Sequence, residues 1–417
     1  MSDLLERLRA LRGGDAPEAP ASPPPDAPPA EVAAAALGGE VVEGASGPVV
    51  RRRVRRPLGE RYGDATLGDG RLHPWLRRWA SRGGGGTPPA GDGGSGATAA
   101  SRGGAGRTVY FDTETTGLAG GVGTRAFLIG LGWHEGDAFV VEQLFLPGPA
   151  HEPAWLDLLA PHLEGAEAWV SYNGGSFDVP LVRTRFAVHG RSDPSVGRLH
   201  LDLLPLARRW WRASLAACTL GTVEREVLGA VRTDADVPGA EVPARYRRFV
   251  QGGDAVGLRG VMTHNELDVV ALAAVHARLE ASFAAGPSAP AAGERPPFDV
   301  AEALGVARWL EAIGEREEAR AHYAAWAEAS PEAAFDAGRL ARRAGDRAAA
   351  VAAWTRAAEA GHAPAWVELA KVREHAERDP EGALAAVAAA RAAGGDPRDD
   401  LDRREARLRA KRARGRS

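Results

Sequence analysis

Cysteine is almost absent from this 417-residue sequence, because Cys218 is the only one. A single cysteine excludes intrachain disulfides and cysteine-based zinc sites, and it is typical of a protein kept in a reducing compartment. No stretch approaches the roughly 18 apolar residues that a membrane span needs, and the N-terminal MSDLLERLRALRGG has no apolar signal core. We therefore expect a soluble, cytoplasmic protein with no membrane contact.

An excess of positive charge is also missing, since the formal net charge is −3. Any binding of nucleic acid must then depend on local basic patches. Such patches occur at Arg51–Arg56, around Arg208, Arg209 and Arg212, and in the arginine-rich tail. A solvated surface is the commoner explanation for each, and non-specific phosphate binding by a disordered basic segment is the alternative.

Composition divides the chain into five parts. We expect residues 1–106 to be mostly disordered, with a small ordered piece at 58–82 and a Gly-rich linker before 107. Residues 107–282 have a hairpin signal at 126–146, followed by alternating strand and helix patterns, which predicts a mixed β-sheet flanked by helices. A linker at 283–298, a helical region at 299–394 and a basic tail at 395–417 follow.

The helical region repeats itself. The segment from Gly314 to Tyr323 aligns with the segment from Gly345 to Trp354, and a weaker copy begins at Asp379. This spacing is in the range of tetratricopeptide-type helical hairpins, which stack on one another and commonly bind partners.

Two carboxylates in VYFDTETTGL are the sharpest feature of the sequence. Apolar residues lead into Asp112 and Glu114, and on a strand the residues i and i+2 project from the same face. Two adjacent like charges raise each other's pKa unless a cation compensates them. Hard oxygen ligands of this kind suit Mg²⁺ or Mn²⁺.

Further acids follow in suitable contexts. Asp178 lies where a strand, an Asn173-Gly174-Gly175 turn and a helix meet, although a helix N-terminus also explains an acid there. His264 and Asp268 are four residues apart and share one face of a helix. Four acids with one histidine fit a phosphodiester hydrolase that uses two metal ions, with Asp112, Glu114, Asp178 and Asp268 as ligands and His264 as general base.

The motifs resemble those of the DEDD 3′→5′ exonucleases, within the ribonuclease H-like superfamily. The flanking text, FDTETTGL, SYNGGSFDVPLV, HLDLLPLARRWW, CTLGTVEREVLG and HNELDVVAL, resembles more narrowly the YprB-type ribonuclease H-like domain. Histidine-type DEDD enzymes usually place the histidine five residues before the last aspartate, and here His264 stands four before Asp268.

The resemblance implies a substrate and its contacts. We expect an exonuclease acting on single-stranded 3′ ends of DNA or RNA, with a possible place in DNA repair beside a partner such as a helicase. The residues expected to contact the terminal nucleotide are Thr115, Thr116, Gly117, Leu118, Asn173 and Phe177.

Simpler explanations exist for several of these residues. A β-turn accounts for 115–118, and a turn role accounts for Asn173. We expect Asp202 to be a helix N-cap and Trp210 and Trp211 to lie in the core. A non-catalytic scaffold that recruits a partner through its repeats, and an endonuclease acting on RNA–DNA hybrids, are the competing functions.

Overall fold

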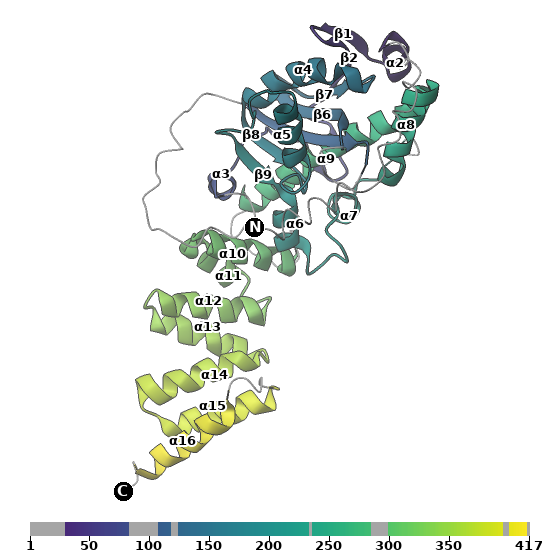
Figure 1. Ribbon diagram of the computed structural model, residues 1–417. Coiled ribbons are helices and arrows are strands. Elements are labelled where there is room, and N and C mark those ends of the chain that lie inside the picture. The colour runs from purple at the N-terminus through teal and green to yellow at the C-terminus, as the bar shows by residue number, and fades with distance from the viewer. Residues whose placement is uncertain are drawn as a thin grey trace, which may run out of the picture.

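The computed structural model describes residues 30–82, 107–117, 124–232, 236–284, 299–394 and 400–414. Within these ranges a seven-stranded mixed sheet flanked by helices is followed by a region built of helices, as Figure 1 shows. The predicted fold class is therefore confirmed. Among the described helices, none is long and apolar enough to cross a membrane.

The sheet has the strand order β1-β2-β7-β6-β5-β8-β9. The first five strands in this order pair antiparallel, and β5, β8 and β9 pair in parallel. The predicted hairpin is the β6–β7 pair, which turns through Gly136 at φ 63°. The bounds are β1 Glu40–Gly44, β2 Gly47–Pro57, β5 Arg107–Thr115, β6 Ala126–Glu135, β7 Ala138–Phe145, β8 Ala166–Ser171 and β9 Leu199–Asp202, with a separate small pair β3 Arg61–Tyr62 and β4 Ala65–Thr66.

Helices cover both faces of the sheet, so nearly every residue of β6 and β7 and the middle of β5 are buried. The long helix α9 (Arg259–Ala284) packs on the face that carries Tyr110, and α4 (Glu152–Glu164) packs on the face that carries Phe111. The other helices of this part are α2 Ala30–Leu37, α3 Pro74–Ser81, α5 Asp178–Val188, α6 Leu203–Trp211, α7 Leu220–Glu226 and α8 Val242–Gly252, with 3₁₀ turns at Pro149–His151, Gly239–Glu241 and Val256–Leu258.

The prediction of a mostly disordered N-terminal region is wrong for residues 30–57, which form α2, β1 and β2, whereas the ordered piece expected at 58–82 contains β3, β4 and α3. Strand β2 pairs with β7 along eight residues, from Val50 opposite Phe145 to Pro57 opposite Ala138. The arginines of this strand are not a free basic segment, since Arg51, Arg52, Arg53 and Arg56 all pair with carboxylates. Composition alone missed this strand because its partner β7 is about 90 residues away in sequence. The expectation for residues 1–29 and for the Gly-rich linker at 83–106 lies outside the described residues.

The C-terminal helices pack in sequence order, each against the next, as Figure 1 shows. Their bounds are α10 Val300–Ile313, α11 Arg316–Ala325, α12 Pro331–Arg343, α13 Arg347–Glu359, α14 Ala363–Val372, α15 Pro380–Ala392 and α16 Leu401–Arg414, with a π-helical turn at Arg373–Glu377. The described part of the basic tail, residues 400–414, is not free: α16 packs on α15 through Leu408, and Arg404, Arg407 and Lys411 pair with the buried Glu374.

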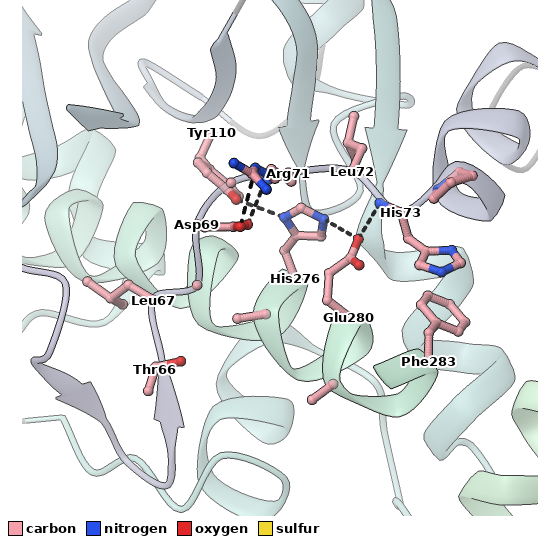
Figure 2. Close-up of a pocket in the computed structure, with 15 residues that line it drawn as sticks. Thr66, Leu67, Asp69, Arg71, Leu72, His73, Tyr110, His276, Glu280 and Phe283 are labelled. Carbon is pink, nitrogen blue, oxygen red and sulfur yellow. Dashed lines mark hydrogen bonds and ion pairs between the residues drawn. The ribbon is translucent and has the colours of Figure 1, made fainter. Parts of the chain in front are cut away.

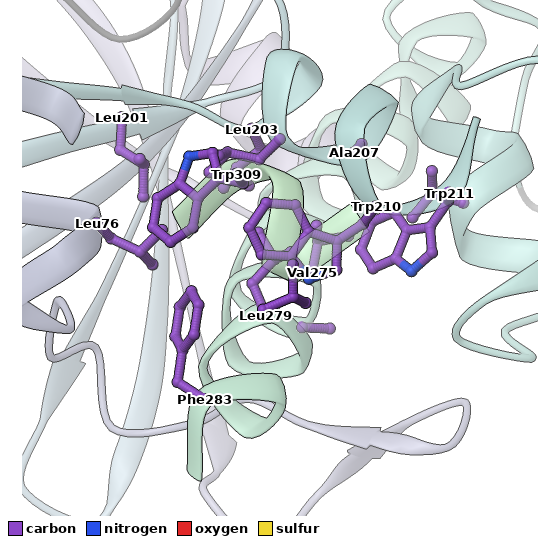
Figure 3. Close-up of a cluster of buried hydrophobic side chains, with 14 of the residues drawn as sticks. Leu76, Leu201, Leu203, Ala207, Trp210, Trp211, Val275, Leu279, Phe283 and Trp309 are labelled. Carbon is purple, nitrogen blue, oxygen red and sulfur yellow. The ribbon is translucent and has the colours of Figure 1, made fainter. Parts of the chain in front are cut away.

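Aromatic side chains join the sheet region to the first C-terminal helices. Trp309 of α10 lies 5.1 Å from Trp210 of α6 and 5.4 Å from Phe283 of α9, measured between ring centroids (Figure 3). Gly305 lets the two backbones approach closely, because a Cβ there would lie 2.5 Å from the carbonyl oxygen of Arg209. Trp210 and Trp211 are buried, so the expectation that they belong to the core is confirmed.

Candidate active site

The predicted carboxylate pair lies at the C-terminal end of the central strand β5. Asp112 pairs in register with Gly130, and Glu114 pairs with Leu128, both on β6. The ladder shifts between Glu114 and Thr115, where the strand ends and the chain turns away. Asp112 and Glu114 project toward the face covered by α9, as the i, i+2 spacing predicted.

Asp178 reaches the same place from the first turn of α5. The strand β8 ends at Ser171, and Asn173 turns the chain in the left-handed region at φ 64°. Asp202 holds this turn, accepting hydrogen bonds from the backbone N–H groups of Asn173 at 2.8 Å and Gly175 at 3.1 Å. Asp202 also caps α6 by accepting from Leu204 N at 3.0 Å, so its predicted capping role is confirmed. The Thr113 hydroxyl, on β5, donates to Asp178 and connects the two elements.

His264 and Asp268 approach from one face of α9. His264 Nε2 lies 3.7 Å from Asp268 Oδ2, and His264 Nδ1 lies 2.7 Å from Asp236 Oδ1. Sequence reasoning missed Asp236, which lies on a loop with no pattern around it.

Burial and mutual repulsion perturb the acids. Burial, followed by the charges of Asp268, Glu114 and Asp178, raises the pKa of Asp112 well above its usual range. Burial and the charges of Asp268 and Asp178 do the same to the pKa of Glu114. Burial also raises the pKa of Asp178 to about 6. Such perturbed groups gather at functional sites, because neighbouring acids store repulsion that a cation relieves.

Arg232 supplies a positive charge at the edge of the acid set, and no sequence signal pointed to it. Its guanidinium pairs with Asp268, with Glu224 at 2.6 Å and with Asp236 at 3.2 Å. Burial alone would lower the pKa of Arg232, but the charges of Asp268 and Glu224 hold it above its usual range. Arg232 therefore neutralises part of the acid set in this conformation.

The donor chemistry fits divalent cations, although the side chains are not arranged as a formed metal site. Among the described residues, no three His, Cys, Asp or Glu side chains converge as metal ligands. Instead Asp112 accepts from the Asn265 amide at 3.0 Å and Asp268 is held by Arg232. Buried carboxylates that repel one another are suitable ligands for Mg²⁺ or Mn²⁺, and a cation at Asp268 would have to replace Arg232 there.

The residues expected to contact substrate follow or flank the acids in the sequence, and their contacts differ. Thr115 Oγ1 donates to the carbonyl of Gly117 at 2.9 Å, and Thr116 Oγ1 accepts from Arg125 N at 3.1 Å, which is turn chemistry. Leu118 lies outside the described residues. Phe177 is 59% exposed beside Asp178, which leaves its ring open to a ligand.

A separate cavity of about 560 Å³ lies toward the other end of α9 (Figure 2). Its polar residues pair with one another: Tyr110 Oη contacts His276 Nδ1 at 2.8 Å, and His276 Nε2 contacts Glu280 Oε1 at 3.2 Å. This cavity does not include the carboxylates of the candidate site.

Comparison with known protein families matches the part of the chain that contains the candidate site. The sequence model of the RNase_H superfamily matches residues 109–280. Residues 109–280 are an RNase_H superfamily domain. Membership of this superfamily is consistent with a hydrolase that acts on nucleic acid. The predicted resemblance to the YprB-type ribonuclease H-like domain is confirmed.

Two further similarities each cover about half of this chain. The chain is 35% identical over 211 residues to the uncharacterized protein YprB of Bacillus subtilis, which is 50% of this chain and 49% of that protein. This chain thus spans about half the length of the curated relative it matches. Among solved structures, the family B DNA polymerase of Pyrobaculum calidifontis aligns with a TM-score of 0.35 and 15% identity, over 53% of this chain and 29% of that one.

Proposed function

We propose that residues 107–282 form a metal-dependent exonuclease that removes nucleotides from single-stranded 3′ ends of DNA or RNA. The single observation that carries the proposal is the clustering of Asp112 and Glu114 on β5 with Asp178 on α5 and Asp268 on α9. At this end of the sheet, burial and the charges of Asp268 and Asp178 raise the pKa of Asp112 and Glu114. The superfamily supports the nuclease chemistry, and the motif contexts support the exonuclease type.

In this proposal the four carboxylates hold two Mg²⁺ or Mn²⁺ ions. Such ions supply an activated water and stabilise the leaving oxygen of a phosphodiester. His264 accepts the proton of the attacking water at Nε2. Asp236 fixes this tautomer, because its carboxylate at 2.7 Å binds the Nδ1–H more closely than Arg232 approaches the same nitrogen, at 3.3 Å.

The substrate contacts are proposed from position. Phe177 is exposed beside Asp178 and offers a ring on which the terminal base can stack. Asn173, Thr115, Thr116, Gly117 and Leu118 would line the path of the terminal nucleotide. A stacking ring accepts any base, so this arrangement suits an enzyme with little sequence preference.

End-labelled oligonucleotides test the proposal. The full chain with Mn²⁺ should shorten a 5′-labelled single strand one nucleotide at a time and release mononucleotides. Asp112→Asn should lower the rate by at least about 10²-fold, as expected when a reacting geometry is lost. Equal rates for the wild type and this variant would reject the proposal, and internal fragments would indicate the endonuclease alternative instead.

The C-terminal helices α10–α16 have no catalytic group in this scheme. We propose that they form tetratricopeptide-like repeats that recruit a protein partner, with DNA repair beside a helicase in the cytoplasm as the setting. Their sequential packing supports this reading. A chain ending near residue 345 keeps α10–α12 and the contacts of Trp309 with the sheet region, so it should keep its nuclease activity and lose a partner that binds α13–α16.

A further inference from the structure

We propose that Arg52, on the N-terminal strand β2, positions the Asp112 carboxylate for metal binding through a buried chain of two amide side chains, Gln143 and Asn265. The inference rests on the proposed function, since it assigns Asp112 as a metal ligand. Strand β2 lies outside the matched superfamily domain, so the inference assigns a role in the site to a further part of the chain.

The residues form one row across the sheet. Arg52 on β2 is opposite Gln143 on β7, Gln143 is opposite Gly130 on β6, and Gly130 is opposite Asp112 on β5. Residues directly opposite one another across a sheet project from the same face. Helix α9 covers this face of the sheet, and its Asn265 packs over the row.

Hydrogen bonds connect the row from end to end. Arg52 Nη1 donates to Gln143 Oε1 at 2.7 Å, and Gln143 Nε2 donates to Asn265 Oδ1 at 3.0 Å. Asn265 Nδ2 then donates to Asp112 Oδ2 at 3.0 Å and to the Asp112 carbonyl at 3.2 Å. Gln143 and Asn265 are fully buried, so water does not compete for these bonds.

Arg52 favours one direction for the whole row of hydrogen bonds. A guanidinium has donors and no acceptor, so Gln143 must present its oxygen to Arg52 and its NH₂ group to Asn265. Asn265 must then accept with its oxygen and present its own NH₂ group to Asp112. The Met262 carbonyl also accepts from Gln143 Nε2, at 2.8 Å, and holds the same orientation. Without Arg52 the buried Gln143 oxygen loses its donor, which loosens the row of amides that ends at Asp112.

Gly130 makes the contact possible. A Cβ on this residue would lie 2.3 Å from Asn265 Oδ1, so only a residue without a side chain lets Asn265 lie over β6. Gly132, two residues along the same face, would instead place a Cβ 2.5 Å from Val269 and 2.6 Å from Phe139. Both glycines are tightly packed, but only Gly130 bears on the hydrogen-bonded row.

Strand β2 also fixes the neighbouring residue of α9. Glu266 accepts from Arg52 at 2.7 Å and from Arg56 at 2.6 Å, and it is only 7% exposed. These ion pairs hold the α9 turn that carries Asn265 against the sheet. Groups that orient a metal ligand from behind commonly change metal affinity or activity about 10–100-fold when removed.

Substitutions at Arg52 provide the first test, in the full chain. Mn²⁺ affinity would be measured by calorimetry, and kcat and KM would be measured at saturating Mn²⁺ with a labelled single strand. Arg52→Met should weaken Mn²⁺ binding about tenfold or more and lower kcat, with KM for the oligonucleotide little changed. Arg52→Lys, which keeps a donor-only group, should retain most of the affinity. Arg53→Met is the matched control, because Arg53 on the same strand pairs with the exposed Glu135.

A pair of glycine variants provides the second test. Gly130→Ala should weaken Mn²⁺ binding by displacing Asn265, whereas Gly132→Ala should lower the melting temperature without that loss of affinity. Wild-type Mn²⁺ affinity in both Arg52→Met and Gly130→Ala would overturn the inference, as would equal losses in all four non-conservative variants. A wild type that binds no Mn²⁺ would instead reject the proposed function, and this inference with it.

Discussion

Replacing Arg232 with glutamine should make the metal-free protein less stable and its response to Mn²⁺ larger. The guanidinium pairs with Glu224, Asp236 and Asp268, and the Glu224 side chain is only 2% exposed. Burial raises the pKa of Glu224, and the pairing with Arg232 counteracts that effect. The substitution removes the charged partner of the buried Glu224 carboxylate and leaves it the hydrogen bond from the Tyr62 hydroxyl.

The size of the effect follows from this burial. Removing one partner of a buried ion pair costs about 3–5 kcal/mol. For a folded unit of this size, each kcal/mol lowers the melting temperature by roughly 2–4 °C. We therefore expect a drop of about 6–20 °C in the absence of metal. The double variant Arg232→Gln/Glu224→Gln should recover part of this drop, because it removes the unpaired charge as well.

Thermal unfolding with and without Mn²⁺ is the assay. In the wild type a metal ion at Asp268 must displace Arg232, whereas in the variant that carboxylate is already free. Mn²⁺ should therefore raise the melting temperature more in Arg232→Gln than in the wild type. Equal increments in the two proteins would refute the idea that Arg232 and the metal compete for Asp268.

Three further predictions follow from the same contacts. Because the pKa of Asp178 is raised to about 6, the metal-free protein should lose stability as pH rises from about 4 to 6, and Asp178→Asn should flatten that slope in pH-dependent denaturation. Hydrogen bonding from Arg407 lowers the pKa of Glu374 to about 2, so the stability it gives α16 should persist above about pH 4.5 and disappear toward pH 2. Hydrogen exchange at Leu408 should show this loss, and Glu374→Gln should release α16 at neutral pH with nuclease activity unchanged. A chain starting at residue 107 should fail to fold cooperatively by circular dichroism, since it exposes the β7 edge; cooperative unfolding would contradict this.

The central carboxylates were predictable because their geometry is local. Asp112 and Glu114 share a face of any strand, and the Asn173–Gly175 turn needs a positive φ that this sequence allows. The capping role of Asp202 follows from its place before an apolar helix, and the structure confirms it. The catalytic roles of these acids and of His264 stay predictions until an activity is measured.

The other polar groups of the site could not be predicted from the sequence. Arg232 and Asp236 lie on a loop without periodicity, and Gln143 follows Glu142 inside a buried strand, where the sequence does not show what either side chain contacts. Asn265 stands beside His264 in the motif, but its position over the sheet depends on the missing side chain of Gly130 on β6. The contacts of Arg232 with Asp268, of Gln143 with Asn265 and of Asn265 with Asp112 join residues that are far apart in the chain.

The sequence by itself determined the β6–β7 hairpin and which face of β5 carries the acids, because strand alternation is fixed by backbone geometry. Tertiary structure alone decided that Arg51–Arg56 is a strand of the sheet instead of a free basic segment, and that the arginines of α16 pair with Glu374. The physical reason is that a charge's role depends on the partner and the solvent around it. Both are set by residues that meet only when the chain has folded.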